Sequence, residues 1–118
     1  MSAAEEIDAL EVDPARLVAW LREDPDLQVI DVREPYERDA GYIADTRHVE
    51  LTQLPSAAAS VRQELPVVFY CRTGSRSLMA AQAFRASGFQ AYSLGGGLVR
   101  WTAEGRPLSP PDGYVADH

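Results

Sequence analysis

A continuous apolar run followed by a polar turn and a helical pattern constrains the fold more than any other feature of the chain. The run is Val67–Tyr70 (VVFY), the turn is Cys71–Ser75, and the helical pattern covers Arg76–Ser87, with Gly88 in the position of a C-cap. A run that does not alternate with polar residues indicates a strand buried on both faces, which is typical of a parallel sheet covered by helices. The segment therefore predicts one strand–turn–helix unit of an α/β fold.

Similar units are expected along the rest of the chain. A helix is predicted from Asp13-Pro14 to Asp24-Pro25, because aspartate is a good N-cap and proline fits the first helical position. Arg33–Gly41 contains Pro35 and is expected to be a loop or a short helical turn. The remaining predicted strands are Ile7–Val12, Leu27–Val32, His48–Leu51 and Phe89–Leu94, and the remaining predicted helices are Pro55–Glu64 and Leu98–Glu104. This alternation predicts an α/β sandwich around a mainly parallel sheet.

The length of the chain fits one domain. With 118 residues it is close to the usual size of a single compact domain and too short for two ordinary ones. We expect one domain over residues 1–118, in which residues 5–108 form the compact core. The proline-rich residues 109–118 are expected to form a loose C-terminal tail on the surface.

The charge of the chain excludes several classes of function. The net charge is −7, and every basic residue is arginine, since the sequence contains no lysine. An acidic chain without a basic tract is not expected to bind nucleic acid or an anionic membrane. The absence of lysine removes Schiff-base chemistry.

Cysteine usage and the N-terminal sequence limit the chemistry and the location. The only cysteine is Cys71, so no internal disulfide forms, and His48 and His118 are the only other soft ligands. No metal or other cofactor is therefore expected. The N-terminus lacks the basic start and apolar run of a signal peptide, and no apolar stretch has the length of a membrane span. We expect a cytoplasmic protein.

The position of Cys71 indicates a reactive centre. In open α/β sheets, ligands bind beyond the carboxyl ends of the strands, and Cys71 directly follows the Val67–Tyr70 strand. The loop after it leads into a helix, whose first N–H groups are free to bind an anion, and Gly74 lets the backbone turn without a Cβ in the pocket. The helix dipole, the inward N–H groups and the charges of Arg72 and Arg76 together favour a thiolate. The alternative is a small core cysteine, but a core segment does not need the polar composition that follows.

Three separated elements resemble the rhodanese family. The loop from Tyr70 to Ser77 resembles the family's active-site loop, in which a cysteine is followed by Arg, a Gly and an Arg-Ser pair. Upstream, the segment from Ile30 to Glu37 (IDVREPYE) resembles the family's Asp-Val-Arg-Glu-Pro element. Downstream, Leu94–Gly97 with Trp101 resembles the closing Leu-x-Gly-Gly and Trp pattern. Their order along the chain makes the resemblance specific, and it implies a three-layer α/β/α sandwich.

The resemblance implies sulfur transfer by ping-pong nucleophilic catalysis. Cys71 would attack the outer sulfur of thiosulfate or a similar donor, sulfite would leave, and a thiophilic acceptor such as cyanide, a thiol or a protein would take the sulfur from the Cys71 persulfide. Arg72 and Arg76 would neutralise the donor. The expected substrate-binding residues are Arg72, Thr73, Gly74, Ser75, Arg76 and Ser77, whose backbone would hold the persulfide while Ser75 and Ser77 add hydroxyl donors.

Several other residues have supporting or structural interpretations. Asp31 lies near the end of the Leu27–Val32 strand and is expected to hydrogen-bond the active-site loop, while Arg33 is expected to pair with a carboxylate. His48 is interpreted as a satisfied surface or supporting histidine rather than a general base. The glycines Gly95–Gly97 are expected to turn against the active-site loop. Trp20 and Trp101 are interpreted as packing residues.

The segment 42–50 departs from the family pattern. Tyr42 stands where the family usually has His, Ala44 and Asp45 replace a Pro-Gly turn, and Glu50 replaces a second Pro. The segment is mainly scaffold in the family, so the departure bears on local geometry, and a changed rim can change the acceptor.

Two functions besides an active sulfurtransferase stay open. The domain could relay sulfur from another protein's persulfide through a docking surface, and its acidic charge would suit a basic partner. It could also be a non-catalytic redox sensor with an exposed thiol. Dephosphorylation is disfavoured, because Cys71 and Arg76 enclose four residues, and family phosphatases place their arginine one residue further away.

Overall fold

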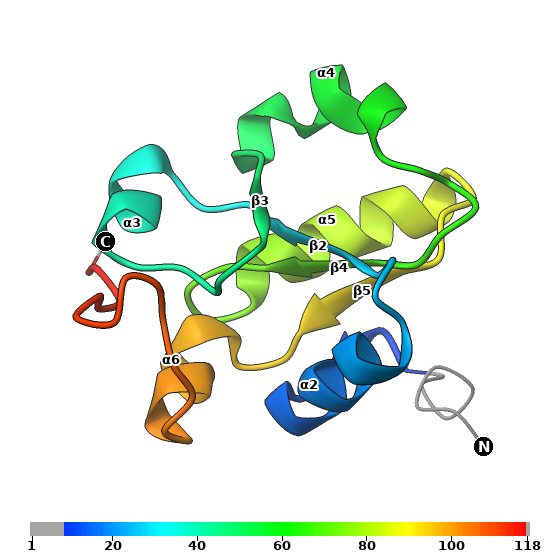
Figure 1. Cartoon of the computed structure of the whole chain (residues 1–118). Helices are drawn as coiled ribbons and strands as arrows, with labels where there is room; N and C mark the ends of the chain where they lie inside the picture. The colour runs from blue at the N-terminus through cyan, green and yellow to red at the C-terminus, as the bar shows by residue number, and fades with distance from the viewer. Residues whose placement is uncertain (1–8, 118) are drawn as a thin grey trace.

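Within its described residues, the chain forms one parallel sheet of five strands. The computed structural model describes residues 9–117. The strands lie in the order β1-β5-β4-β2-β3, and every neighbouring pair is parallel (Figure 1). Their bounds are Glu11–Val12 for β1, Gln28–Asp31 for β2, Arg47–His48 for β3, Val67–Tyr70 for β4 and Ala91–Leu94 for β5. The predicted parallel α/β architecture is confirmed.

The central strand β4 is buried as its sequence predicts. All four of its residues are fully buried, and it pairs with β2 on one side and β5 on the other. The register aligns Tyr70 at the end of β4 with Asp31 at the end of β2. Cys71 therefore leaves the sheet beside Val32, whose N–H donates to the carbonyl of Tyr70 at 3.0 Å.

Helices cover both faces of the sheet, and the sheet separates two apolar clusters (Figure 1). One cluster contains Leu17 and Trp20 from α2 (Pro14–Glu23) with Leu98 and Trp101 from α6 (Gly97–Ala103). The other cluster brings α4 (Leu54–Ala57) and α5 (Ser75–Ala86) against the opposite face, and it contains Cys71. Both tryptophans are buried, which confirms their interpretation as packing residues.

The helix predicted over Pro55–Glu64 is wrong. The chain forms only the single turn α4 in that region, between two 3₁₀ turns, η1 (Leu51–Gln53) and η2 (Ala58–Ser60). Ser60 Oγ donates to the carbonyl of Ala57 at 2.6 Å and so takes an acceptor that a longer helix would use. Val61 then adopts an extended conformation and enters the core, which ends the helical path.

Other elements agree in type but differ in their bounds. The predicted loop or short helical turn at Arg33–Gly41 contains α3 (Pro35–Ala40), which begins at its proline. The edge strand predicted at His48–Leu51 is β3, at Arg47–His48, because Leu51 already begins η1. The first predicted strand began at Ile7, and its residues before Ala9 lie outside the described residues; the observed part is β1.

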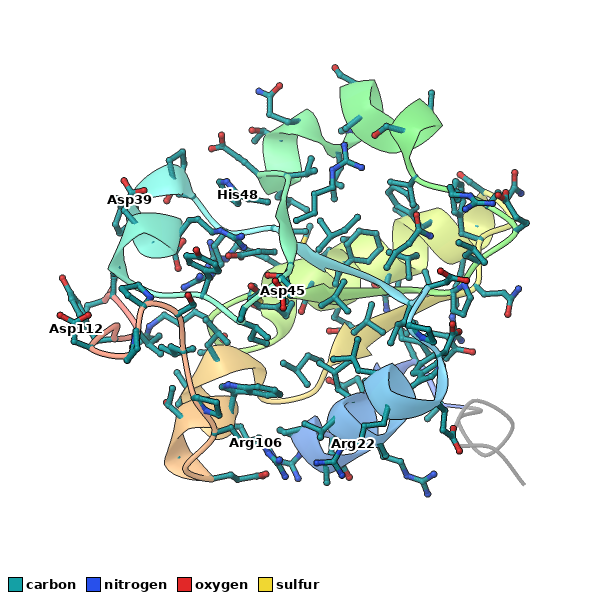
Figure 2. All side chains as sticks on the ribbon, in the orientation of Figure 1. Arg22, Asp39, Asp45, His48, Arg106 and Asp112 are labelled. Carbon is teal, nitrogen blue, oxygen red and sulfur yellow. The ribbon has the colours of Figure 1, made fainter. Side chains whose placement is uncertain are left out.

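The C-terminal segment is anchored rather than loose. Tyr42 and Ser109 exchange two backbone hydrogen bonds of 3.0 and 2.7 Å, and the N–H of Tyr114 donates to Ala40 O at 2.9 Å. Leu108 and Val115 pack against the α2–α6 cluster, which explains why the segment follows this path. The segment therefore lies beside α3, as Figure 1 shows, and Figure 2 places Asp39 and Asp112 at the same edge of the molecule.

Tyr42 also shows how the atypical segment 42–50 is accommodated. The guanidinium of Arg38 stacks over its ring at 3.8 Å from the centroid, and its backbone forms the bridge to the C-terminal segment. Asp45 takes a positive φ of 62°, which aspartate tolerates better than most residues.

Among residues 9–117, no helix is long and apolar enough to cross a membrane.

Candidate active site

The loop after β4 wraps around the sulfur of Cys71. Gly74 has a φ of +106°, which a residue with a Cβ rarely adopts, and this turn aims its N–H at the sulfur. Cys71 Sγ accepts hydrogen bonds from the N–H of Gly74 at 3.1 Å and the N–H of Ser77 at 3.4 Å. Two backbone donors on one sulfur form a cradle that stabilises negative charge there. The predicted inward turn of the loop N–H groups is thus present at these two positions.

A pair of buried serines completes the surroundings of the sulfur. Ser77 Oγ lies 3.5 Å from Cys71 Sγ, donates to Gly74 O at 3.2 Å and lies 2.7 Å from Ser93 Oγ. Both serines are fully buried. Sequence reasoning missed Ser93, although a serine within the otherwise apolar strand β5 (AYSL) is a signal that a buried partner is needed.

The turn between β5 and α6 supports the loop from the other side. Leu98 N–H donates to Cys71 O, and Val99 N–H donates to Arg72 O, both at 3.0 Å. A Cβ on Gly97 would lie 2.5 Å from Arg72 O, so only glycine allows this approach. The expected packing of Gly95–Gly97 against the active-site loop is confirmed.

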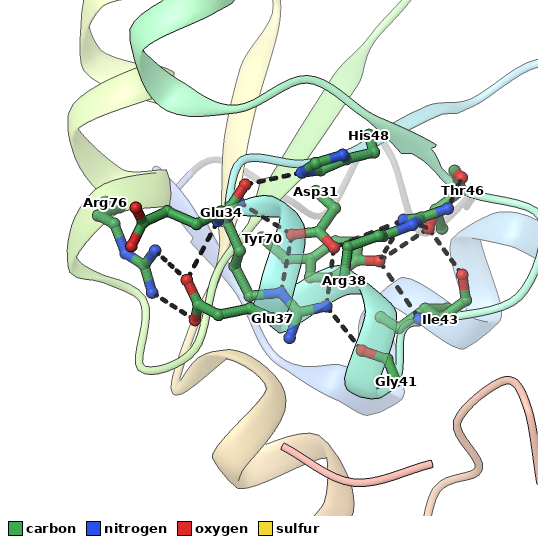
Figure 3. Close-up of polar contacts among 11 residues, drawn as sticks. Asp31, Glu34, Glu37, Arg38, Gly41, Ile43, Thr46, His48, Tyr70 and Arg76 are labelled. Atoms are coloured by element: carbon green, nitrogen blue, oxygen red, sulfur yellow. Dashed lines mark hydrogen bonds and ion pairs between the residues drawn. The ribbon is translucent and has the colours of Figure 1, made fainter. Parts of the chain in front are cut away.

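Arg76, at the end of the loop, is held by a buried carboxylate. Its two terminal nitrogens bind the two oxygens of Glu37 at 2.7 and 2.9 Å (Figure 3). Burial alone would raise the pKa of Glu37, but the hydrogen bonds from Arg76 and from the Glu34 N–H, together with the charge of Arg76, outweigh it and hold that pKa below its ordinary value. The hydrogen bond to Glu37, and more weakly the charges of Cys71 and Glu34, raise the pKa of Arg76. Much of the positive charge expected from Arg76 is therefore balanced within the protein.

Arg72 turns towards the C-terminal segment. Its Nε donates to Ala116 O at 3.2 Å, and its Nη2 pairs with Asp117 at 3.2 Å. Thr73 and Ser75, the other predicted substrate-binding residues, are exposed at the surface of the loop. Sequence reasoning missed Glu37 and Asp117, the two carboxylates that meet the loop arginines.

Asp31 and Arg33 form a fully buried pair beneath α3. Arg33 binds both oxygens of Asp31 at 2.8 Å and donates to Gly41 O at 2.7 Å, which confirms that Arg33 pairs with a carboxylate. The expected hydrogen bond from Asp31 to the active-site loop is wrong: the carboxylate binds Arg33 and Arg38 instead (Figure 3). The two residues therefore fix α3, which carries Glu37, rather than touching the sulfur.

Tyr70 and His48 complete this supporting network. Tyr70 Oη lies 2.7 Å from Thr46 Oγ1, and burial raises the pKa of Tyr70 to about 12. His48 Nε2 lies 2.7 Å from Arg33 O, as expected of a satisfied supporting histidine.

A small pocket opens beside the loop at the carboxyl edge of the sheet. We call it the edge pocket; its volume is about 200 Å³. Its wall residue Val32 belongs to the same buried cluster as Cys71. The edge pocket is lined by Val32, Glu34, Glu50, Leu51, Thr52 and Arg76. Among the described residues, no three His, Cys, Asp or Glu side chains gather in a way that could hold a metal ion.

Comparison with known proteins identifies the family. The model of the rhodanese-like domain matches residues 13–104. The chain belongs to the rhodanese-like domain family. A sulfurtransferase of Allochromatium vinosum is 30% identical to this rhodanese-like domain over 104 residues, which cover 87% of this chain and 97% of the relative. Thiosulfate sulfurtransferase GlpE of Pseudomonas aeruginosa is 35% identical over 86 residues, covering 72% of this chain and 74% of GlpE.

The fold of this rhodanese-like domain also has solved counterparts. A rhodanese-related protein from Thermoplasma volcanium superimposes with a TM-score of 0.77 at 25% identity, over 85% of this chain and 97% of its own. The predicted family and fold are thus confirmed.

The side chain of Cys71 is fully buried beneath its loop, whereas the redox-sensing hypothesis assumed an exposed thiol. The same burial bears on sulfur transfer, because a donor and an acceptor have to reach the same sulfur.

Proposed function

We propose that this rhodanese-like domain is a sulfurtransferase that carries a transferable sulfur as a persulfide on Cys71. The observation that carries the proposal is the closed loop around Cys71 Sγ, in which the N–H groups of Gly74 and Ser77 both point at the sulfur. The same donors would stabilise the negative charge of the terminal sulfur of a persulfide. The sulfurtransferase names of relatives at 30% and 35% identity support the reaction class.

The reaction has two displacement steps. In the first, the Cys71 thiolate attacks the outer sulfur of a donor such as thiosulfate, a new S–S bond forms, and sulfite leaves with the electrons of the broken S–S bond. In the second, an acceptor such as cyanide attacks the terminal sulfur and returns the thiolate. This is nucleophilic catalysis with a covalent intermediate, and it needs no metal or redox cofactor.

The size of the loop supports sulfur over phosphate as the transferred group. Four residues separate Cys71 from Arg76, and the N–H groups of Gly74 and Ser77 already reach the cysteine sulfur. The cradle therefore closes on one atom, which suits a terminal sulfur better than a tetrahedral oxyanion. We place the reaction in the cytoplasm, with a small sulfur compound or a persulfidated protein as donor and a thiophilic molecule or protein as acceptor.

Intact-protein mass spectrometry tests the proposal. The reduced protein is incubated with thiosulfate, and a gain of one sulfur atom that cyanide removes is expected. Cys71→Ser, which keeps the size of the side chain, should gain nothing while showing the same circular dichroism spectrum. A reduced wild-type protein that stays unloaded by thiosulfate, by thiosulfonates and by a persulfidated cysteine desulfurase would refute the proposal.

A further inference from the structure

A cavity larger than the edge pocket lies between α3 and the C-terminal segment. Its lining comes from residues 36–40 and 110–114, and its volume is about 350 Å³. We call it the tyrosine pocket, because α3 contributes Tyr36 to it and the C-terminal segment contributes Tyr114, with exposed fractions of 46% and 65%. Tyrosine is enriched in protein–protein interfaces, so two exposed rings on one cavity indicate a binding surface.

Backbone contacts hold the two walls of the tyrosine pocket together. The N–H of Tyr114 donates to Ala40 O at 2.9 Å, and a Cβ on Gly41 would lie 2.9 Å from both the N and the O of Tyr114. The C-terminal segment thus approaches the end of α3 as closely as glycine allows. The pocket therefore exists without a ligand, and a partner does not have to order its walls on binding.

The tyrosine pocket carries negative charge that the chain does not balance. Asp39 and Asp112 both line it and lie at the same outer edge of the molecule (Figure 2). Within the described part of the chain, neither carboxylate has a hydrogen-bond or ion-pair partner. Arg38, the only basic residue of α3, stacks over the ring of Tyr42 instead, and no arginine or lysine follows Arg106. The pocket therefore offers two carboxylates and no cation.

Aromatic faces and free carboxylates in one pocket both attract a cation. A guanidinium suits them best, because its flat face stacks on a ring while its N–H groups bind carboxylate oxygens. Arg38 shows the same combination within this chain, since it stacks over Tyr42 at 3.8 Å from the ring centroid and pairs with Asp31 at 3.5 Å. We propose that the tyrosine pocket binds an arginine side chain of a partner protein.

The exposure of the pocket favours a protein side chain over a free small cation. Its four charged or aromatic lining residues are all exposed, whereas small-molecule sites bury most of their ligand. A side chain in this pocket is held in addition by the contacts that the rest of its protein makes around it. The net charge of −7 also attracts a basic partner before contact.

The two walls of the pocket belong to segments that hold the arginines of the active-site loop. α3 carries Glu37, which pairs with Arg76, and Asp117 of the C-terminal segment pairs with Arg72. A partner docked here therefore contacts the segments next to that loop. The inference concerns docking alone and does not depend on sulfur transfer at Cys71.

Nuclear magnetic resonance of the isotope-labelled full chain tests the assignment. The probe is a short acetylated peptide of glycine and serine with three arginines, and matched peptides carry citrulline, which has the shape of arginine without its charge, or lysine. The arginine peptide should cause saturable shifts in the amide signals of residues 36–40 and 112–114, and its affinity should fall with added salt. The citrulline peptide should cause none. Argininamide is the small-molecule probe and should bind more weakly than the peptide.

The charge of the pocket is tested by a matched pair of variants. Asp39→Asn/Asp112→Asn removes both carboxylates and should weaken binding of the arginine peptide about three-fold or more. Asp26→Asn/Glu64→Gln makes the same change in net charge at residues that precede β2 and β4, at the opposite edge of the sheet from α3. This control should bind the peptide as the wild type does.

The rings have their own pair of variants. Tyr36→Leu/Tyr114→Leu removes both aromatic faces and should weaken binding about five-fold or more, while Tyr36→Phe/Tyr114→Phe keeps the faces and should restore it. Circular dichroism of each variant should match the wild type.

Four outcomes would overturn the inference. They are equal binding of the citrulline peptide, shifts that lie outside the pocket, equal weakening by the charge variant and its control, and binding of the lysine peptide or of argininamide as tight as that of the arginine peptide. Since no sulfur donor is present in these titrations, none of the four outcomes bears on the reaction proposed for Cys71.

Discussion

Replacing Gly97 with alanine is expected to displace the active-site loop. Gly97 has a φ of +57°, and a Cβ there would lie 2.5 Å from Arg72 O and 2.6 Å from Cys71 O. These are backbone atoms, so either the loop or α6 has to move to make room. The same two carbonyl groups accept the N–H bonds of Leu98 and Val99 at 3.0 Å, and a shift would break both.

The magnitude follows from a comparison with a second glycine. Gly105 has a similar φ of +77°, but a Cβ there meets nothing within 4 Å. Gly105→Ala should therefore show only the cost of a left-handed alanine, about 1–2 kcal/mol of the free energy of unfolding. Gly97→Ala adds the loss of two buried hydrogen bonds, and we expect a total of about 3–5 kcal/mol.

Urea unfolding and sulfur loading measure the two effects separately. The free energy of unfolding of both variants is obtained from urea titrations at pH 7, and the rate of persulfide formation on Cys71 is measured at low temperature, where both stay folded. Gly97→Ala should lose most of its loading rate, and Gly105→Ala should load as the wild type does. Equal destabilisation of the two variants, or a normal loading rate in Gly97→Ala, would refute the role we assign to the close approach.

Three further changes test the network around the loop, each by urea unfolding. Glu37→Gln removes the carboxylate that holds Arg76 and should lower the free energy of unfolding by about 2–4 kcal/mol at pH 7. Because the pKa of Glu37 is held below its ordinary value, this stabilisation is present above about pH 4.5 and disappears as the pH falls through the lowered value, so the variant and wild type should converge in acid. Burial raises the pKa of Tyr70 to about 12, so the wild type should lose stability as the pH rises from 10 to 12, and Tyr70→Phe should not show this loss. Ser77→Ala removes the hydroxyl partner of Ser93 and should lower the free energy of unfolding by about 1–2 kcal/mol. The variant should still load sulfur, since both backbone N–H donors to the sulfur of Cys71 remain.

The parts of the site that are local in sequence could be predicted. The apolar run Val67–Tyr70, the positive φ of Gly74 and the start of α5 each depend on a few neighbouring residues. Together these local features predict the loop around Cys71 without reference to any long-range contact. The position of Gly97 was also accessible, because a run of glycines after a strand indicates a close backbone approach.

The partners of the charged residues could not be predicted. Arg72 and Arg76 were expected to face an anionic donor, but Arg76 meets Glu37, 39 positions away in sequence, and Arg72 meets Asp117, 45 positions away. Those meetings depend on how α3 and the C-terminal segment dock, which in turn depends on the buried Asp31–Arg33 pair and on the Tyr42–Ser109 bridge. Charge in a sequence therefore does not reveal how much of it remains available to a ligand.

The incorrect prediction of a helix over residues 55–64 has a different cause. The alanine-rich composition favours a helix, but helix propensity differs by less than 1 kcal/mol between most residues, and tertiary packing overrides it. Burial of Val61 takes the chain out of the helical path, and the hydroxyl of Ser60 bonds the carbonyl of Ala57 in the turn just before it. The resulting short α4 leaves an apolar groove of about 350 Å³ open between this segment and α5.

The strand order explains why three distant motifs form one site. The parallel strands β2, β4 and β5 lie side by side, so their carboxyl ends meet at one edge of the sheet. β2 leads into the segment that carries Glu37, β4 leads into the loop of Cys71, and β5 leads into Gly97. The outer two segments each bind the central loop, one by an ion pair and the other by backbone hydrogen bonds. The cradle around Cys71 is therefore a property of all three strand ends, and a change in either outer segment should alter sulfur loading without touching the cysteine.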